Sequence, residues 1–371
     1  MQVTGYSYPW DVDADFLGRA TELGVDEVAV AVAYHSARAA TPWSKRGTSV
    51  LARHAALYRP VRAGWGVLRP APADWVDSPD SAGDAIRSLT GAGIPAAAWL
   101  VLTHNSLLGS AFPEYSVQNC FGEHYPWALC PAHEEVCEFA ARLTAEALTD
   151  LDVRTVVLEA CGQLGAVHQH QHEKTDAVWS PEAVRVLSVC CCPACTESWA
   201  ERGIDPVATR ELLRNEALRL ISGEQAENRL PAEVRAVLLD TRQRATDRLR
   251  QEVCKQIGAQ RRVLLHASAD PWATGALPGL TPAAAGEVDG VVVPCWKPSG
   301  LAEVASASAV SSADIGAYVT AVGPEVPDMT QYVRELRAAG ADELHLYHLG
   351  LAGPARWPHL RRAVEEAHRA G

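Results

Sequence analysis

The sequence predicts an α/β protein, a (β/α)8 barrel with a long helical insertion after its fourth strand. Eight short β-rich runs alternate with longer helical patterns along the 371 residues, which indicates parallel β/α architecture. Several runs are continuously apolar, as is typical of strands that have packed side chains inside a barrel and helices outside it. Since the length fits one barrel with insertions, we expect residues 1–371 to form a single domain in which 160–260 is an insertion of loop, cysteines and helices.

The boundaries of the strands follow from the apolar runs and from glycines that close helices. Helical patterns cover Ala14–Leu23, Asp84–Thr90 and Glu134–Leu148. Gly24 and Gly340 each follow a helical pattern just before a β-rich run, which is the usual punctuation of a helix-to-strand connection. The eight expected strands are Val3–Tyr8, Glu27–Tyr34, Ile94–Leu102, Thr155–Glu159, Val263–His266, Gly290–Pro294, Ala317–Val322 and Leu344–His348.

The segment Pro206–Gln260 interrupts this alternation. It is too long for one barrel helix, and it reads as two helices joined near Gly223–Pro231. Its faces are rich in Arg and Glu, so we expect them to be solvated. The segment is then either an outer helix pair without chemistry or an arm through which two copies of the chain associate.

Composition narrows the classes of ligand. The formal net charge is −12 and the chain holds four lysines, which argues against nucleic acid or an anionic membrane as partner because neutralising phosphates needs clustered basic residues. No apolar run reaches the roughly 18–20 residues of a membrane span. The start Met1–Tyr6 lacks a secretory signal, and ten cysteines suit a reducing compartment. We expect a cytoplasmic protein with a neutral small-molecule substrate, and both a monomer and a homo-oligomer fit the sequence.

The thiols suggest a metal site. Cys190, Cys192 and Cys195 offer three ligands within six residues, and Cys130 is our choice for the fourth, which would complete a structural zinc site of four thiolates. The alternative is a set of buried thiols without a metal. We interpret the other cysteines as packing residues; they include Cys120, Cys137, Cys254 and Cys295.

The order of these features resembles a known family. His124-Tyr125 is followed by Cys130-Pro131, a helix, a strand ending in Glu159, and then Cys-x-Cys-x-x-Cys. This order, over about residues 119–203, is similar to that of the glycoside hydrolase family 42 β-galactosidases and of related glycosyl-hydrolase-like barrels. The resemblance implies a (β/α)8 barrel and a zinc ion held by the four cysteines.

The resemblance also implies that Glu159 is the acid/base residue of a glycosidase. The chain departs from the family at two positions. Leu158 stands where the galactosidases have Asn, and the seventh strand, Ala317–Val322, ends without their nucleophilic Glu. The nearest carboxylates to that strand end are Glu325 and Asp328.

The chemistry of glycoside cleavage needs two carboxyl groups on opposite sides of the scissile bond. Glu159 ends an apolar strand, and burial of this kind raises the pKa of a carboxyl group, as a general acid requires. Its partner could be Asp270, which follows the fifth strand, or Glu325. Each of the three could instead be a structural residue, Glu159 as the partner of an arginine at the barrel mouth.

Aromatic and polar residues recur after the other strands, at the end of the barrel where active sites lie. Ring faces stack on a pyranose while polar groups bind its hydroxyls, so together they favour a sugar-like ligand, although each alone could be a packing residue. The expected substrate-binding residues are Tyr8, Trp10, Tyr34, His35, His104, Asn105, Trp272, Trp296, Lys297, Tyr347 and His348.

Three alternating histidines after the fourth strand permit a rival mechanism. His168, His170 and His172 would project to one side of an extended loop, where they could contact the substrate. They could also hold a second, catalytic metal with Glu159 or Glu173 as base, in a hydrolase, isomerase or lyase. A solvated loop is the third possibility.

A third class of function also fits the sequence. The seventh strand lacks a terminal carboxylate, so the barrel could bind a carbohydrate without cleaving it.

Overall fold

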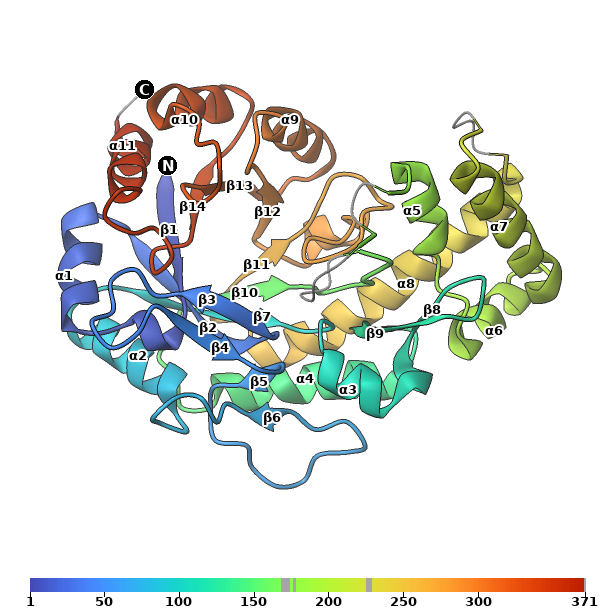
Figure 1. The fold of residues 1–371 in the computed structure, drawn as a ribbon, viewed down its shortest axis with the longest axis horizontal. Helices are drawn as coiled ribbons and strands as arrows, with labels where there is room; N and C mark the ends of the chain where they lie inside the picture. The colour runs from blue at the N-terminus through green and yellow to red at the C-terminus, as the bar shows by residue number, and fades with distance from the viewer. Residues whose placement is uncertain (168–173, 176–177, 225–228, 370–371) are drawn as a thin grey trace.

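The computed structural model describes residues 1–167, 174–175, 178–224 and 229–369, and its eight parallel strands close into a barrel (Figure 1). The barrel closes because β1 pairs with both β2 and β14. The strands are β1 (Gln2–Ser7), β2 (Glu27–Tyr34), β7 (Ala96–Val101), β10 (Thr155–Glu159), β11 (Arg262–His266), β12 (Gly290–Pro294), β13 (Asp314–Thr320) and β14 (Glu343–Tyr347). The predicted (β/α)8 fold is confirmed.

The predicted strand positions hold to within a few residues. The largest difference is at β13, which begins at Asp314 instead of Ala317, because Gly290 of β12 pairs with Asp314 and so extends the ladder past the apolar run. The sequence did not indicate several short elements in the loops. They are β3 (Ala37–Ala40), β4 (Ser49–Ala52), β5 (Ala56–Leu57), β6 (Ala71–Pro72), β8 (Ser116–Gln118), β9 (His124–Leu129) and α3 (Ser106–Ala111).

Helices surround the barrel. The first begins at the N-cap Asp13, whose side chain accepts a hydrogen bond from the Phe16 N–H, and ends at Gly24 in the left-handed conformation, as the sequence predicts. Between β11 and β12 the chain forms a long loop with one short 3₁₀ turn, Ala284–Gly286. The barrel helices are α1 (Ala14–Leu23), α2 (Ser81–Gly91), α4 (Glu134–Leu148), α8 (Ala232–Ile257), α9 (Gly300–Val310), α10 (Met329–Ala338) and α11 (Trp357–His368).

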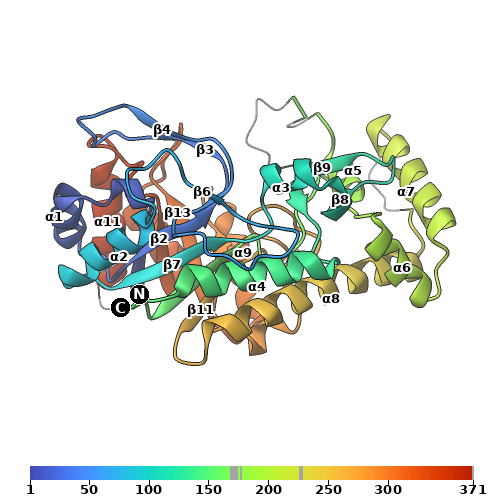
Figure 2. The same ribbon diagram turned by 90° about the horizontal axis from the view of Figure 1, so that it is seen from below.

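The chain between β10 and β11 extends to one side of the barrel, where α5 (Pro181–Leu187), α6 (Pro193–Glu201) and α7 (Pro206–Ile221) lie near β8 and β9 (Figure 2). Helix α8 then returns along α4 to β11. The two predicted helices, α7 and α8, are therefore present. Among the described residues, no helix is long and apolar enough to cross a membrane.

Most charged residues of α8 are exposed or half-buried, as expected, but Arg242 and Arg250 are buried. Arg250 is fully buried, and it forms ion pairs of 2.6 Å with Asp247 and with Glu287, which lies in the loop before β12. A buried guanidinium with several acceptors can cover a barrel as an aliphatic side chain would. For this reason the many charged residues of α8 did not indicate that this helix packs against the barrel.

Candidate functional site

The carboxyl group of Glu159 is held at the carboxyl end of the barrel by side chains from both neighbouring strands. Trp99 of β7 donates a hydrogen bond from Nε1 to Glu159 Oε2 at 2.8 Å. On the other side, His266 of β11 places its Nδ1 3.4 Å from the same oxygen. The Glu159 side chain is only 7 % exposed. The position that the sequence predicted for Glu159, a buried strand end at the barrel mouth, is what the structure shows.

Buried tyrosines lie at this end of the barrel, and three of them, Tyr34, Tyr318 and Tyr347, interact electrostatically with Glu159. The Tyr8 hydroxyl lies 3.5 Å from that of Tyr34, and burial raises the pKa of both well above its usual value. Burial also raises the pKa of Tyr318 and Tyr347. All four hydroxyls therefore keep their protons at neutral pH and can donate hydrogen bonds.

Most of the predicted binding residues form one continuous group of rings at the same end of the barrel. Ring centroids lie 4.6 Å apart for Tyr8 and Trp10, and 4.3 Å apart for Tyr8 and His348. His35 lies between Tyr34 and His104, at 4.2 and 4.4 Å. Trp296 extends this group to Tyr347 at 5.7 Å and is 42 % exposed, so it marks the open side. We call this group the ring cluster: Tyr8, Trp10, Tyr34, His35, His104, Trp296, Tyr347 and His348.

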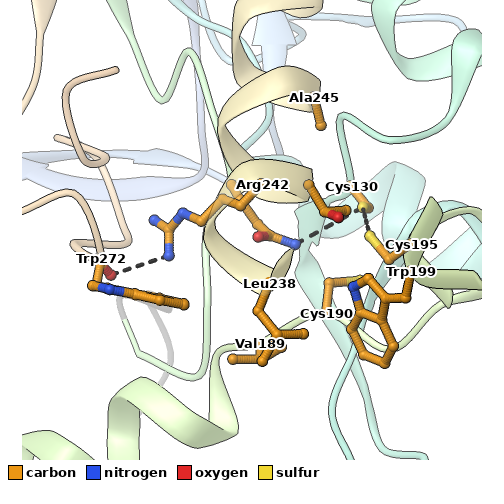
Figure 3. A pocket seen from close by; sticks show the side chains of 11 residues that line it. Cys130, Val189, Cys190, Cys195, Trp199, Leu238, Arg242, Ala245 and Trp272 are labelled. Atoms are coloured by element: carbon orange, nitrogen blue, oxygen red, sulfur yellow. Dashed lines mark hydrogen bonds between the residues drawn. The ribbon is translucent and has the colours of Figure 1, made fainter. Parts of the chain in front are cut away.

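Three other predicted binding residues have different surroundings. Asn105 caps α3, where its Oδ1 accepts a hydrogen bond from Leu108 N. The backbone carbonyl of Lys297 accepts a hydrogen bond from the Tyr332 hydroxyl, while the Lys297 residue is exposed. Trp272 lines a pocket together with thiols of the insertion, as Figure 3 shows.

The two predicted partner carboxylates follow β11 and β13, so they lie toward the same end of the barrel as Glu159. Asp270 forms a 2.6 Å ion pair with Arg185 of α5, and its side chain is 39 % exposed. Glu325 is an exposed residue of the loop before α10. The predicted His168, His170, His172 and Glu173 lie outside the described residues.

Asp11 is a carboxylate at this mouth that the sequence did not single out. It follows β1, its side chain is 7 % exposed, and its Oδ2 lies 3.9 Å from His348 Nδ1. Burial raises the pKa of Asp11 to about 7, although a hydrogen bond from the Tyr8 N–H and the charge of Arg19 act in the opposite direction. Burial also lowers the pKa of His348 to about 3.

Four more side chains near Glu159 were missed: Tyr6, Trp99, His266 and Tyr318. They lie within strands and point into the barrel, where the sequence led us to expect packing. One signal could have identified them, since an aromatic or histidine side chain within an otherwise aliphatic β-rich run is conspicuous.

The four predicted metal ligands come together. The sulfur atoms of Cys130, Cys190, Cys192 and Cys195 lie within 4.8 Å of one another, and all four residues are buried. Figure 3 shows Cys130 beside Cys195, with Sγ atoms 3.7 Å apart. In the same view Arg242 of α8 donates to the Trp272 carbonyl at 3.0 Å. The arrangement is compatible with a metal site that joins the end of β9 to the start of α6.

Comparison with known proteins identifies the fold and no more. No family model matches the sequence, and no curated protein matches it. Among solved structures, the catalytic domain of a β-amylase from Paenibacillus polymyxa matches with a TM-score of 0.59 and 9 % identity, over 99 % of both chains. The α-L-fucosidase isoenzyme 2 from Paenibacillus thiaminolyticus matches with a TM-score of 0.57 and 12 % identity.

A third solved structure is a catalytic mutant of Gan42B, a GH42 β-galactosidase from G. stearothermophilus, with a TM-score of 0.56 and 10 % identity. The match covers 99 % of this chain and 56 % of the galactosidase, whereas the fucosidase match covers 95 % and 45 %. The chain thus spans about half the length of these two proteins. At such low identity the likeness shows a shared barrel fold, and this fold occurs here in proteins named as glycosidases.

Proposed function

We propose that this protein is a glycosidase-like hydrolase that acts on a small carbohydrate or glycoside, with Glu159 as its general acid/base. One observation supports this most. A buried carboxyl group at the end of β10 places its Oε2 near both Trp99 and His266, and it interacts electrostatically with the protonated hydroxyls of Tyr34 and Tyr347 of the ring cluster. Rings of this kind stack on sugar faces, and hydroxyls bind the sugar's polar groups.

In this proposal Glu159 protonates the oxygen of the leaving group as the glycosidic bond breaks. Trp99 and His266 fix the orientation of its carboxyl group. The second carboxyl group would act as nucleophile or as the base that activates water. Asp270 and Glu325 stay as the candidates that the sequence gave, and Asp11 joins them because it is buried beside the ring cluster.

We also propose that the four cysteines hold a structural zinc ion, as the resemblance to the family 42 galactosidases implies. A tetrahedral site with zinc–sulfur bonds of about 2.3 Å places its sulfurs about 3.8 Å apart. Cys130 Sγ lies 3.7 Å from Cys195 Sγ and 3.8 Å from Cys192 Sγ, so the residues fit the ion. The ion would cross-link the chain and take part in no catalytic step. We also propose that residues 1–371 form a single domain, in which 160–260 is an insertion. Thiolate ligands suit the cytoplasm, where we place the protein.

The test of the catalytic proposal is the variant Glu159→Gln, which removes the proton and keeps the shape. On a panel of aryl glycosides with poor leaving groups, kcat/KM should fall by about 10²-fold or more. Glu335→Gln, an exposed change on α10, serves as the control and should behave as wild type. A wild-type rate for Glu159→Gln would make Glu159 a structural residue.

Binding without cleavage is the second candidate function. It is favoured by the end of β13, where Thr320 stands in place of a carboxylate. Sugars that bind by calorimetry and are not turned over would support it. A metal-dependent hydrolase, isomerase or lyase that uses the histidine loop stays a prediction; chelator-sensitive turnover would distinguish it from both.

A further inference from the structure

Polar side chains form a continuous line through the interior of the barrel and end at Glu159. The line starts at the amino ends of β11 and β14, where Arg262 and Glu343 are the first residues of their strands. It ends at the carboxyl end of β10. We call these residues the axial chain: Arg262, Glu343, His345, Tyr6, His266 and Glu159.

Each step of the axial chain is a short contact. Arg262 Nη1 lies 2.5 Å from Glu343 Oε1, and Glu343 Oε2 lies 3.2 Å from His345 Nε2. The Tyr6 hydroxyl lies 3.1 Å from His345 Nδ1 and 2.9 Å from His266 Nε2. Both histidines are fully buried. Tyr6 is fully buried as well, so its hydroxyl connects the two histidines inside the barrel.

At the end of the axial chain where Arg262 and Glu343 lie, the charges of these two residues determine the protonation states. Burial acts to raise the pKa of Glu343, but the hydrogen bond with His345 and the charge of Arg262 outweigh it and lower that pKa overall. Glu343 is thus an ionised acceptor. Burial lowers the pKa of His345, so His345 is neutral and carries its single ring proton on Nε2, where it donates to Glu343.

The remaining hydrogen bonds then have one direction. His345 Nδ1 carries a lone pair, so it accepts from the Tyr6 hydroxyl, whose proton is retained because burial raises its pKa well above the usual value. The Tyr6 oxygen in turn accepts from His266 Nε2–H. In its neutral form His266 then has no second ring proton, so its Nδ1 presents a lone pair 3.4 Å from Glu159 Oε2.

We propose that the axial chain keeps the proton of Glu159 in place, because it presents the lone pair of His266 Nδ1, and not an N–H group, to the Glu159 carboxyl. An acceptor at this position is satisfied only by a protonated carboxyl group, which is the form a general acid needs. Tyr6, His345 and Glu343 are then positioning residues that act through His266. The inference rests on the proposed role of Glu159 for its catalytic meaning, but the direction of the chain is independent of that role.

Other groups that face this end of the chain do not reverse the direction. Trp99 of β7 donates a hydrogen bond from Nε1–H to Glu159 Oε2. A protonated carboxyl group can accept this hydrogen bond as well as an ionised one. Among the described residues, the hydroxyls of Tyr34, Tyr318 and Tyr347 from β2, β13 and β14 also interact electrostatically with Glu159, and burial keeps them neutral. Near Arg262 and Glu343, the carboxyl group of Glu27 interacts electrostatically with both Tyr6 and Glu343.

The direct test is to read the ring protons of both histidines in the intact protein by ¹⁵N NMR of histidine-labelled samples. Signals are assigned by their loss in the variants His266→Gln and His345→Gln. We expect protonated Nε2 and bare Nδ1 in both rings. A protonated Nδ1 on neutral His266 would overturn the proposal, whatever the activity.

Two variants test the coupling. Tyr6→Phe removes one hydroxyl from the line, so His266 should populate both neutral ring forms. Glu343→Gln supplies an amide donor to His345 and should move the ring proton of His345 to Nδ1 and that of His266 to Nδ1. Tyr58→Phe, which removes a buried hydroxyl outside the axial chain, should leave both ring forms unchanged. An unaltered His266 in both Tyr6→Phe and Glu343→Gln contradicts the proposal.

Activity gives an independent measurement. In Tyr6→Phe the basic limb of the pH profile of kcat/KM should shift to lower pH by about one unit. This shift is the equivalent of one hydrogen bond of ordinary strength. The shift should vanish when Glu159→Gln is combined with it. If Glu159→Gln alone leaves activity unchanged while the ring forms are as expected, the proposed function fails and the axial chain stands. If the limb does not move in an active Tyr6→Phe variant, the chain does not hold the proton.

Discussion

The hydrogen bond from Trp99 to Glu159 fixes the orientation of the Glu159 carboxyl group. Trp99→Phe keeps an aromatic ring but removes the Nε1–H donor, so the carboxyl group loses the contact that fixes its orientation. We expect kcat/KM to fall on the order of tenfold to a hundredfold, with a loss of stability of about 1–3 kcal/mol. Steady-state kinetics and urea unfolding measure the two effects.

Trp357→Phe on α11 is the matched control, because Trp357 is also buried but lies outside the site. It should lower stability by a similar amount and leave kcat/KM unchanged. Equal kinetic losses in both variants would show that the Trp99 effect is general destabilisation.

The raised pKa of Asp11 predicts that the free energy of unfolding falls as pH rises. Its pKa is about 7 in the folded protein and about 3.9 in an unfolded chain, so the folded state holds the proton more tightly. This contribution is fully present below the unfolded pKa and is lost as pH rises through the folded one. Between about pH 4 and pH 7 the free energy of unfolding should fall by up to about 4 kcal/mol relative to Asp11→Asn. Urea unfolding across that range checks it, and parallel curves for the two proteins would refute it.

At the scale of elements, the cysteine cluster ties the strand β9 and helix α4 to the start of α6. Cys192→Ser removes one of the four sulfurs, so we expect bound zinc to drop from about one equivalent to less than about half, with a lower midpoint of thermal unfolding. Elemental analysis and calorimetry measure these.

Cys295→Ser provides the comparison for this prediction. Cys295 is buried far along the chain, and its Sγ contacts the Gly300 carbonyl at 3.6 Å. Zinc content should stay at the wild-type level in this variant. Purified wild-type protein without zinc would contradict the proposed ion itself.

At the scale of the whole molecule, the insertion is anchored to the barrel through α8. Arg250 pairs with Glu287 of the loop before β12, and Arg248 donates to the carbonyls of Pro131 and Ala132 beside Cys130. We therefore expect one cooperative unfolding transition, coincident by circular dichroism and by tryptophan fluorescence, which a chelator shifts as a whole. Two separate transitions would mean that residues 160–260 fold as an independent unit.

The sequence by itself determined the barrel and the end of the barrel at which Glu159 lies. Apolar runs closed by glycines predict strands and helices because burial and the backbone freedom of glycine are local properties of the chain. The same is true of Cys190, Cys192 and Cys195, whose spacing indicates a ligand set, and of Glu159, whose position at the end of an apolar strand indicates the barrel mouth. Each of these inferences needs only neighbours along the chain.

Only the tertiary structure decided what each reactive group contacts. Tyr6 and His345 are 339 positions apart, yet their polar atoms meet inside the barrel. Asp11 is an ordinary carboxylate in the sequence, and its pKa is raised because the closed barrel buries it. Likewise Trp99 and His266 reach Glu159 only because their strands flank β10. Closure brings distant residues together, and no local pattern encodes which pairs will meet.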